Sequence, residues 1–256
     1  MTSGSNDQNG KSAPERASAA RSLPRRFFEL ADYEQRPEGW LIVLDGRPVK
    51  TPCKASLVLP SKALARAVAQ EWAAQGETID PETMLLTKLA NTAIDRVKGR
   101  EGEVAQEIAG YASSDLLCYR ADSPQELAEL QGAIWDPVLE WAASTLAARF
   151  QRVAGVVHVA QPEETLAAVG RAIEAFDAFG LTGLHNMTTL TGSCLLALAY
   201  GHRHLTAEQA WHAALVDEDW QISQWGEDRE ARERREKRWG EFVASCRFLD
   251  LCRAAD

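Results

Sequence analysis

The chain has 256 residues, of which 45% are hydrophobic, and this allows one large globular domain or two smaller ones with a substantial core. Acidic residues outnumber basic ones by 37 to 28, which gives a formal net charge of −9. A broad basic face for a phosphate-rich partner is therefore not expected, and nucleic-acid binding is disfavoured.

The five cysteines are scattered, odd in number and without CxxC spacing. This pattern suits a reducing compartment better than a secreted disulfide framework. The longest apolar run, residues 194–200, is far shorter than the roughly 20 residues of a membrane-spanning helix. We therefore expect no membrane insertion.

Residues 1–24 are rich in Ser, Ala, Gly and Asn and almost lack large apolar side chains, which predicts a disordered tail. The tail carries arginines, as mitochondrial presequences do, but Asp7 and Glu15 argue against a presequence. A bacterial cytoplasm fits this tail best. A mitochondrial matrix location would follow if the source were eukaryotic and the tail cleavable.

Residues 25–98 are predicted to form a β-rich N-terminal domain with one or two helices. Between residues 25 and 60, short aromatic or β-branched runs alternate with Pro, Gly and Asp-Gly, a pattern typical of hairpins. Asp45-Gly46 is the clearest turn, because both residues tolerate positive φ. A helix over residues 61–75 is indicated by Ser61 as N-cap, and a second helix begins at Pro81.

Residues 99–256 are predicted to form a mostly helical C-terminal domain, so the fold class is α+β. A break is expected near Asp136-Pro137, because a proline disfavours helical backbone in the residue before it. The nearly apolar run over 184–200 is predicted to be the central helix. The remaining expected segments are helices over 103–111, 135–150, 163–179 with Gly180 as C-cap, 207–225 and 229–251, an extended piece over 116–119 and a strand over 152–160.

The histidines suggest a metal or acid-base site. His202 and His204 form an HxH pair, and His185 and His212 are near in sequence. There is no HExxH motif, however, and the HxH pair falls in a predicted turn, where polar residues are common. We expect neither a metal nor a cofactor, and an enzyme that uses these histidines with the acidic helix is the alternative.

That acidic helix, within residues 213–233, combines carboxylates with tryptophans. Three consecutive acids, Asp217, Glu218 and Asp219, span about 200° of a helix, so at most two can face one site. Helical spacing places Glu218 near Ile222 and Trp225, with Trp220 pointing elsewhere. Such acids are often surface solubilisers, but a half-buried one needs a cation, and an arginine on a partner protein would serve. The charged run 227–238 is interpreted as a solvated face.

Five blocks, in this order, carry a family resemblance: LDGRPVKTP at 44–52, LTKLANTAID at 86–95, DLLCYRAD at 115–122, WDP at 135–137 and DEDWQISQWGED at 217–228. Together they resemble the assembly chaperones of the F-type ATP synthase catalytic head that handle the alpha subunit. The likeness covers about residues 25–251.

The resemblance implies a non-enzymatic protein, monomeric when free, that binds the unassembled alpha subunit and shields the surface that later contacts beta. The family's critical carboxylate corresponds to Glu218, with Asp219 and Glu227 as alternatives. The implied partner-binding residues are Glu218, Asp219, Gln221, Ile222, Trp225 and Glu227. The family-motif residues are Asp45, Gly46, Arg47, Pro48, Lys50, Thr51, Pro52, Leu89, Asn91, Asp95, Asp115, Tyr119 and Arg120. A generic interaction domain for another client is the third possibility.

Overall fold

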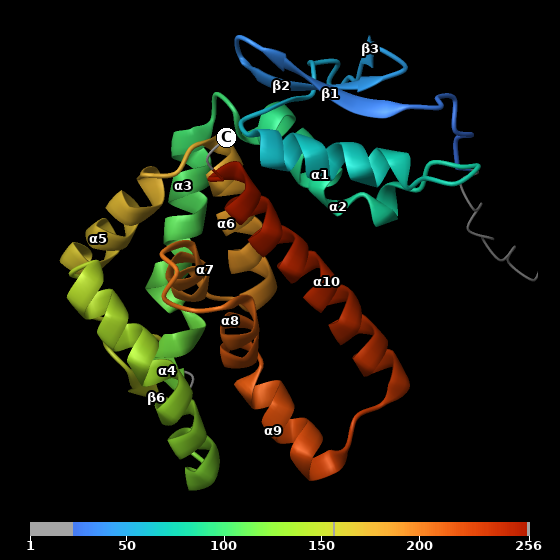
Figure 1. Ribbon diagram of the computed structural model, residues 1–256. Coiled ribbons are helices and arrows are strands. Elements are labelled where there is room, and N and C mark those ends of the chain that lie inside the picture. The colour runs from blue at the N-terminus through green and yellow to red at the C-terminus, as the bar shows by residue number, and fades with distance from the viewer. Residues whose placement is uncertain (1–22, 156, 255–256) are drawn as a thin grey trace, which may run out of the picture.

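A computed structural model describes residues 23–155 and 157–254. A small antiparallel sheet lies at one end, and helices make up the rest (Figure 1), so the predicted α+β class is confirmed. Most of the predicted tail, residues 1–22, lies outside the described residues. In the described part of the chain, no helix is both long and apolar enough to cross a membrane.

The sheet is organised around one hairpin. β1 (Ala31–Arg36) pairs antiparallel with β2 (Gly39–Leu44), and β2 also pairs with the two-residue strands β3 (Arg47–Pro48) and β4 (Val58–Leu59). The predicted turn between β2 and β3 is confirmed: Asp45 has φ 47° and Gly46 has φ 73°. Positive φ at both central residues matches the twist of the flanking strands.

Two helices cover the sheet and are locked together. α1 (Lys62–Ala73) begins at the predicted N-cap, where Ser61 accepts a hydrogen bond from Leu64 N. The Glu71 carboxylate accepts bonds from Leu86 N and Thr87 N at 2.7 and 2.8 Å, which caps α2 (Leu85–Thr92). The helix expected from Pro81 thus starts as a 3₁₀ turn, η1 (Pro81–Thr83), and α2 ends in a π-helix, η2 (Ala93–Val97).

The helical part of the described chain contains more elements than expected. They are α3 (Glu101–Gly110), η3 (Tyr111–Ser114), η4 (Leu116–Cys118), β5 (Tyr119–Arg120), α4 (Gln125–Thr145), β6 (Val153–Ala154), α5 (Glu163–Glu174), α6 (Ala178–Thr191), α7 (Cys194–Gly201), α8 (Ala207–Ala214), α9 (Val216–Trp225) and α10 (Arg229–Cys252).

The break expected at Asp136-Pro137 is absent, because α4 runs through Pro137 without interruption. Burial of Trp135 and Val138 holds this helix against the core, and the Trp135 indole donates to Ala213 O at 2.7 Å. Tertiary packing therefore outweighs the local preference of the residue before proline. The strand expected over 152–160 is confined to β6, which pairs parallel with β5.

Two predicted helices are each divided in two. The central run 184–200 is split at Gly192, whose φ of 71° ends α6, and Ser193 then caps α7. Positive φ at Gly192 carries little strain and ends the helix at that point. Gly180 is not a C-cap: it lies in the first turn of α6, where its N–H donates to Asp177. The run 207–225 is divided at Leu215 into α8 and α9.

Two hydrophobic clusters form the core, one among the helices and one between the sheet, α1 and α2. α10 connects them, because its Phe248 belongs to the second cluster and Ser61 Oγ donates to Leu251 O at 2.5 Å. The division of the chain near residue 98 stays a prediction, since the last helix completes the N-terminal core.

Candidate functional site

The acidic helix α9 projects away from the sheet end of the molecule, next to the start of α10 (Figure 1). Every residue of α9 belongs to the described part of the chain, and among them only Val216 is buried. Packing against the core therefore does not explain the composition of this helix. Its side chains line two grooves on opposite sides.

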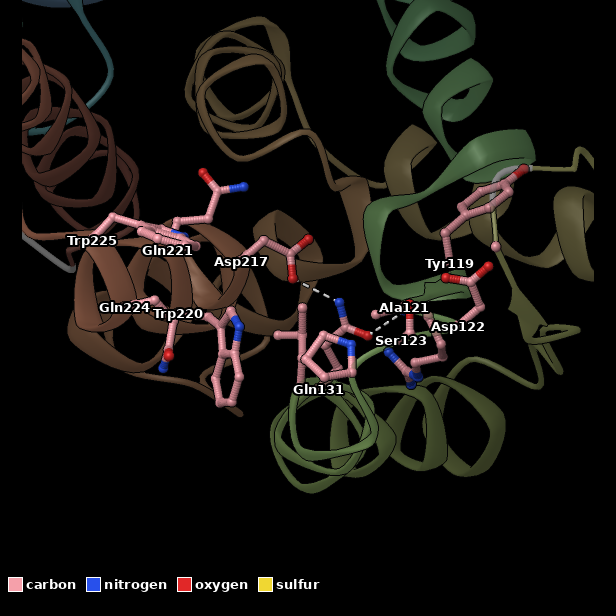
Figure 2. Close-up of a pocket in the computed structure, with 14 residues that line it drawn as sticks. Tyr119, Ala121, Asp122, Ser123, Gln131, Asp217, Trp220, Gln221, Gln224 and Trp225 are labelled. Carbon is pink, nitrogen blue, oxygen red and sulfur yellow. Dashed lines mark hydrogen bonds between the residues drawn. The ribbon is translucent and has the colours of Figure 1, made fainter.

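The first groove, here called the tryptophan groove, lies between α9, the start of α4 and β5, with a volume of about 640 Å³. Figure 2 shows side chains from α9 and from the segment before α4 facing one another across it. Its lining residues are Tyr119, Arg120, Ala121, Asp122, Ser123, Pro124, Leu127, Gln131, Gly155, Asp217, Trp220, Gln221, Gln224 and Trp225.

Gln131 fixes the floor of the tryptophan groove. Its Nε2 donates to Asp217 Oδ1 at 2.6 Å, and its Oε1 accepts from Ala121 N at 2.7 Å (Figure 2). Gln131 is itself buried, so these bonds satisfy a polar side chain that has little access to water. Asp217 therefore helps to hold α9 against α4.

Arg120, which also lines the tryptophan groove, is held in place by Asp136 and Trp135. Its Nη2 lies 2.6 Å from Asp136, and its guanidinium lies over the Trp135 ring at 4.8 Å. Burial lowers the pKa of Arg120, while Asp136 opposes that change. Asp136 also pairs with Arg152 at 2.9 Å. The DLLCYRAD and WDP blocks therefore meet in one ion-pair network.

The second groove, here called the ion-pair groove, separates α9 from α10 and has a volume of about 500 Å³. Arg235 of α10 bridges it, with its Nη2 2.5 Å from Asp219 and its Nη1 3.9 Å from Glu218. Arg238 approaches Glu218 at 3.5 Å. The groove is lined by Trp211, Asp219, Ile222, Glu227, Arg232, Arg235, Glu236 and Trp239.

Glu218 is half-buried, with 35% of its side chain exposed. Its cations, however, come from α10 of the same chain. The prediction of a solvated face over residues 227–238 is wrong for Arg235, which is only 24% exposed. Residue spacing carries no signal for this pairing, because the pairing depends on how α9 and α10 face each other.

The face expected for α9 is also corrected. Ile222 lines the ion-pair groove, whereas Trp225 lines the tryptophan groove with Gln221. Trp225 is 87% exposed and Trp220 is half-buried. The structure thus places Asp219, Ile222 and Glu227 on one side of α9, and Gln221 and Trp225 on the other.

Of the family-motif residues, Tyr119 and Arg120 line the tryptophan groove, and the others lie elsewhere. Asp95 of η2 accepts from Thr51 Oγ1 at 2.6 Å and from Cys53 N at 3.0 Å, which joins two blocks beside the sheet. Leu89, on α2, lines a small cavity between α2 and α6. Pro52 and Gly46 belong to the loops of the sheet, and Asn91 Oδ1 is buried with no hydrogen-bond partner among the described residues.

Asp115 is fully buried beneath the start of α7. Its Oδ1 accepts from Leu117 N at 3.1 Å, and its Oδ2 accepts from Leu195 N at 3.2 Å. Burial raises the pKa of this carboxyl, although hydrogen bonds, the largest from Ser193, act in the opposite direction. Its surroundings indicate a structural cap that holds η4 to α7.

The histidines do not gather around the acidic helix. His202 and His204 pack on Trp141, with ring centroids 5.6 and 5.2 Å away, and burial lowers the pKa of His202. His212 lies 3.4 Å from Asp219. Among the described residues, no group of three or more His, Cys, Asp or Glu side chains is placed to hold a metal ion.

A family model and several solved structures match this chain and indicate the same kind of protein. The family model described as ATP12 chaperone protein matches residues 25–143. The crystal structure of Atp12 from Paracoccus denitrificans is 40% identical, with a TM-score of 0.86 over 90% of this chain and 99% of that chain. An aspartate-to-lysine mutant of the same protein is 39% identical, with a TM-score of 0.86 over 91% of this chain and 100% of that chain.

A third similar structure is that of the Atu1473 protein from Agrobacterium tumefaciens. It is 45% identical, with a TM-score of 0.86 over 89% of this chain and 86% of that chain. The resemblance deduced from the five sequence blocks is therefore confirmed.

Proposed function

This chain belongs to the ATP12 chaperone family, and from this membership we propose that it binds the unassembled alpha subunit of the F-type ATP synthase catalytic head. Assembly of ATP synthase is the function that the family supports. The finer proposal is that the chain prevents aggregation of the alpha subunit until alpha pairs with beta. Catalysis is not part of the proposed role.

The observation that carries the proposal is Trp225, an indole 87% exposed at the tip of a helix that buries only Val216 in the core. Aromatic side chains exposed beside a groove are typical anchors of protein interfaces. An unassembled subunit exposes apolar surface and is prone to aggregation, so a holding protein must offer apolar contact.

The carboxylates that face α10, on the other side of α9 from Trp225, supply discrimination. We propose Glu218, Asp219, Gln221, Ile222, Trp225 and Glu227 as partner-binding residues, with Glu218 as the most important. Charged groups at the rim of an interface steer encounter and reject wrong partners more than they add affinity. Because Glu218 already contacts Arg238, a client arginine would join or replace an existing ion pair.

Release by competition with the beta subunit completes the proposal. The surface that this chain shields is then the surface that beta occupies, so formation of the alpha–beta contact removes the client. An interface of moderate affinity favours such an exchange, because this chain must dissociate from alpha. Affinity differences between related complexes lie mostly in the dissociation rate.

Co-expression with the alpha subunit tests the proposal directly. We expect a larger soluble fraction of alpha and a complex of the two chains by size-exclusion chromatography. Addition of beta should then release the chain from alpha. Unchanged solubility of alpha, with no complex detected, would rule the proposal out.

Metal analysis of the purified protein distinguishes the enzyme alternative from the proposed chaperone role. A stoichiometric metal would favour it, whereas the packing of His202 and His204 on Trp141 gives these residues a structural explanation. Size-exclusion chromatography of the free chain also tests the expectation that it is monomeric.

A further inference from the structure

A second exposed apolar surface lies at the sheet end of the molecule, in the segment that precedes β1. Three of its large apolar side chains are exposed: Leu23 at 42%, Phe27 at 73% and Leu30 at 62%. Single exposed apolar residues are normal on any protein, but a group of them on one short segment is typical of an interaction surface.

The backbone of this segment is fixed by its neighbours. The Arg26 guanidinium donates to Phe28 O at 3.0 Å, to Glu29 O at 2.9 Å and to Gln75 O at 2.5 Å. From the hairpin turn, Asp45 Oδ1 accepts from Glu29 N at 3.1 Å and from Leu30 N at 2.8 Å.

Main-chain bonds continue this attachment on the other side, where Arg26 N donates to Glu77 O at 2.9 Å and Ile79 N donates to Pro24 O at 2.8 Å. Phe27 and Leu30 are therefore presented to solvent on an ordered support. A contact made by side chains on a fixed backbone loses less conformational entropy on binding than one made by a flexible segment.

A cavity of about 460 Å³ opens beside Phe27. Its apolar lining comes from Phe27, Phe28, Leu44, Val49 and Trp72, together with Pro48. Its polar lining comes from Asp45, Arg47 and Lys50. The Asp45 carboxylate is bonded to two amides of the segment, and the exposed cations Arg47 and Lys50 outnumber its single negative charge at the rim.

We propose that the Phe27 surface, defined as Leu23, Phe27, Leu30, Arg47 and Lys50, is a second contact for the client. Its ligand is a client segment that places an apolar side chain next to a carboxylate. The apolar side chain enters the cavity beside Phe27, and the carboxylate pairs with Arg47 or Lys50. This inference rests on the proposed function, because the client is the one bound at α9.

Two separated contacts suit a holding function. The Phe27 surface lies at the sheet end, whereas α9 projects from the opposite end (Figure 1). Stable protein complexes bury about 800 Å² on each partner, more than a helix tip supplies. Linked weak contacts bind together more tightly than either contact alone, yet each can be displaced separately.

Photo-crosslinking identifies the occupant. With p-benzoylphenylalanine at position 30 of the full chain, co-expressed with the alpha subunit, we expect crosslinks to an alpha peptide in which an apolar residue neighbours Asp or Glu. Crosslinks confined to a second copy of this chain, or to its own residues 1–22, would overturn the inference.

Affinity measurements test the same surface independently. The double variant Phe27→Ser/Leu30→Ser is expected to raise the Kd for alpha about tenfold or more, as loss of interface anchors does. Val157→Ser is the matched control, because Val157 is also exposed, at 71%, and is expected to leave the Kd within about twofold. Arg47→Glu should weaken binding and reduce its salt dependence.

The outcomes separate the two proposals. If the wild-type chain does not bind alpha, the proposed function fails. If the wild-type chain binds and the double variant, with an unchanged melting temperature, binds equally well, only the Phe27 surface is excluded.

Discussion

Glu218 of α9 lies 3.5 Å from Arg238 of α10, so the carboxylate proposed to contact the client already pairs with a cation of its own chain. Arg235 approaches the same carboxylate at 3.9 Å and Asp219 at 2.5 Å. These pairs span the ion-pair groove and hold α9 against α10. Glu218 can therefore act on the client directly or through the position of α9.

A charge swap separates these two roles. Glu218→Lys places a third cation beside Arg235 and Arg238 and should lower the unfolding free energy by about 1 kcal/mol, since the pair is half-exposed. We expect client binding to be lost. Glu218→Lys/Arg238→Glu restores opposite charges and should recover part of the stability, measured by urea unfolding, without recovering client binding; Arg238→Glu alone is the control, because it also loses the bond to Leu190 O. Recovery of binding would show that Glu218 acts by positioning α9.

Removal of the exposed indole should affect binding alone. Trp225→Ala is expected to change the unfolding free energy by less than about 0.5 kcal/mol, because surface substitutions rarely do more. The Kd for alpha should rise about tenfold or more, measured by isothermal titration calorimetry. Trp135→Ala is the contrasting variant: its side chain is 1% exposed, and truncation should cost about 3 kcal/mol or more. Unchanged client affinity in Trp225→Ala would remove the proposed anchor.

The bond between Thr51 Oγ1 and Asp95 joins two family blocks and should stabilise the fold. Thr51 is buried, so Thr51→Val leaves the carboxylate with one partner fewer and should cost about 1–2 kcal/mol in urea unfolding. Thr92→Val is the matched control, because the exposed Thr92 hydroxyl donates to Lys88 O and to no other group in the described part of the chain. Equal costs for the two variants would contradict this role.

Acid should weaken the network at Asp136. Burial raises the pKa of Asp136, but hydrogen bonds from Arg152 and Arg120 outweigh it and leave the pKa below the ordinary value of 3.8. A carboxyl whose pKa is lowered by folding stabilises the native state above its unfolded pKa, and this stabilisation is lost as pH falls through the folded pKa.

Asp136→Asn should therefore cost about 2 kcal/mol at neutral pH, because Arg120 is left buried without its charge partner. The difference from wild type should shrink as pH falls below about 4. Urea unfolding of both proteins over this range measures it, with Asp122→Asn on the exposed rim of the tryptophan groove as control. A difference that does not depend on pH would show that the ionised carboxylate is not the source of the stability.

Local patterns in the sequence determined the α+β class, the Asp45-Gly46 turn, the N-cap at Ser61 and the five blocks that carry the family resemblance. Each depends on a few neighbouring residues or on helical spacing, so each can be recognised without knowing the fold.

Only the tertiary structure decided what faces these residues. Gly226, with φ 79°, turns the chain between α9 and α10 and brings Arg235 to Asp219. Burial of Trp135 keeps α4 helical through Pro137. Helical spacing fixes directions within one helix, but the partner across a groove depends on how two helices pack, and the sequence of one helix does not contain that information.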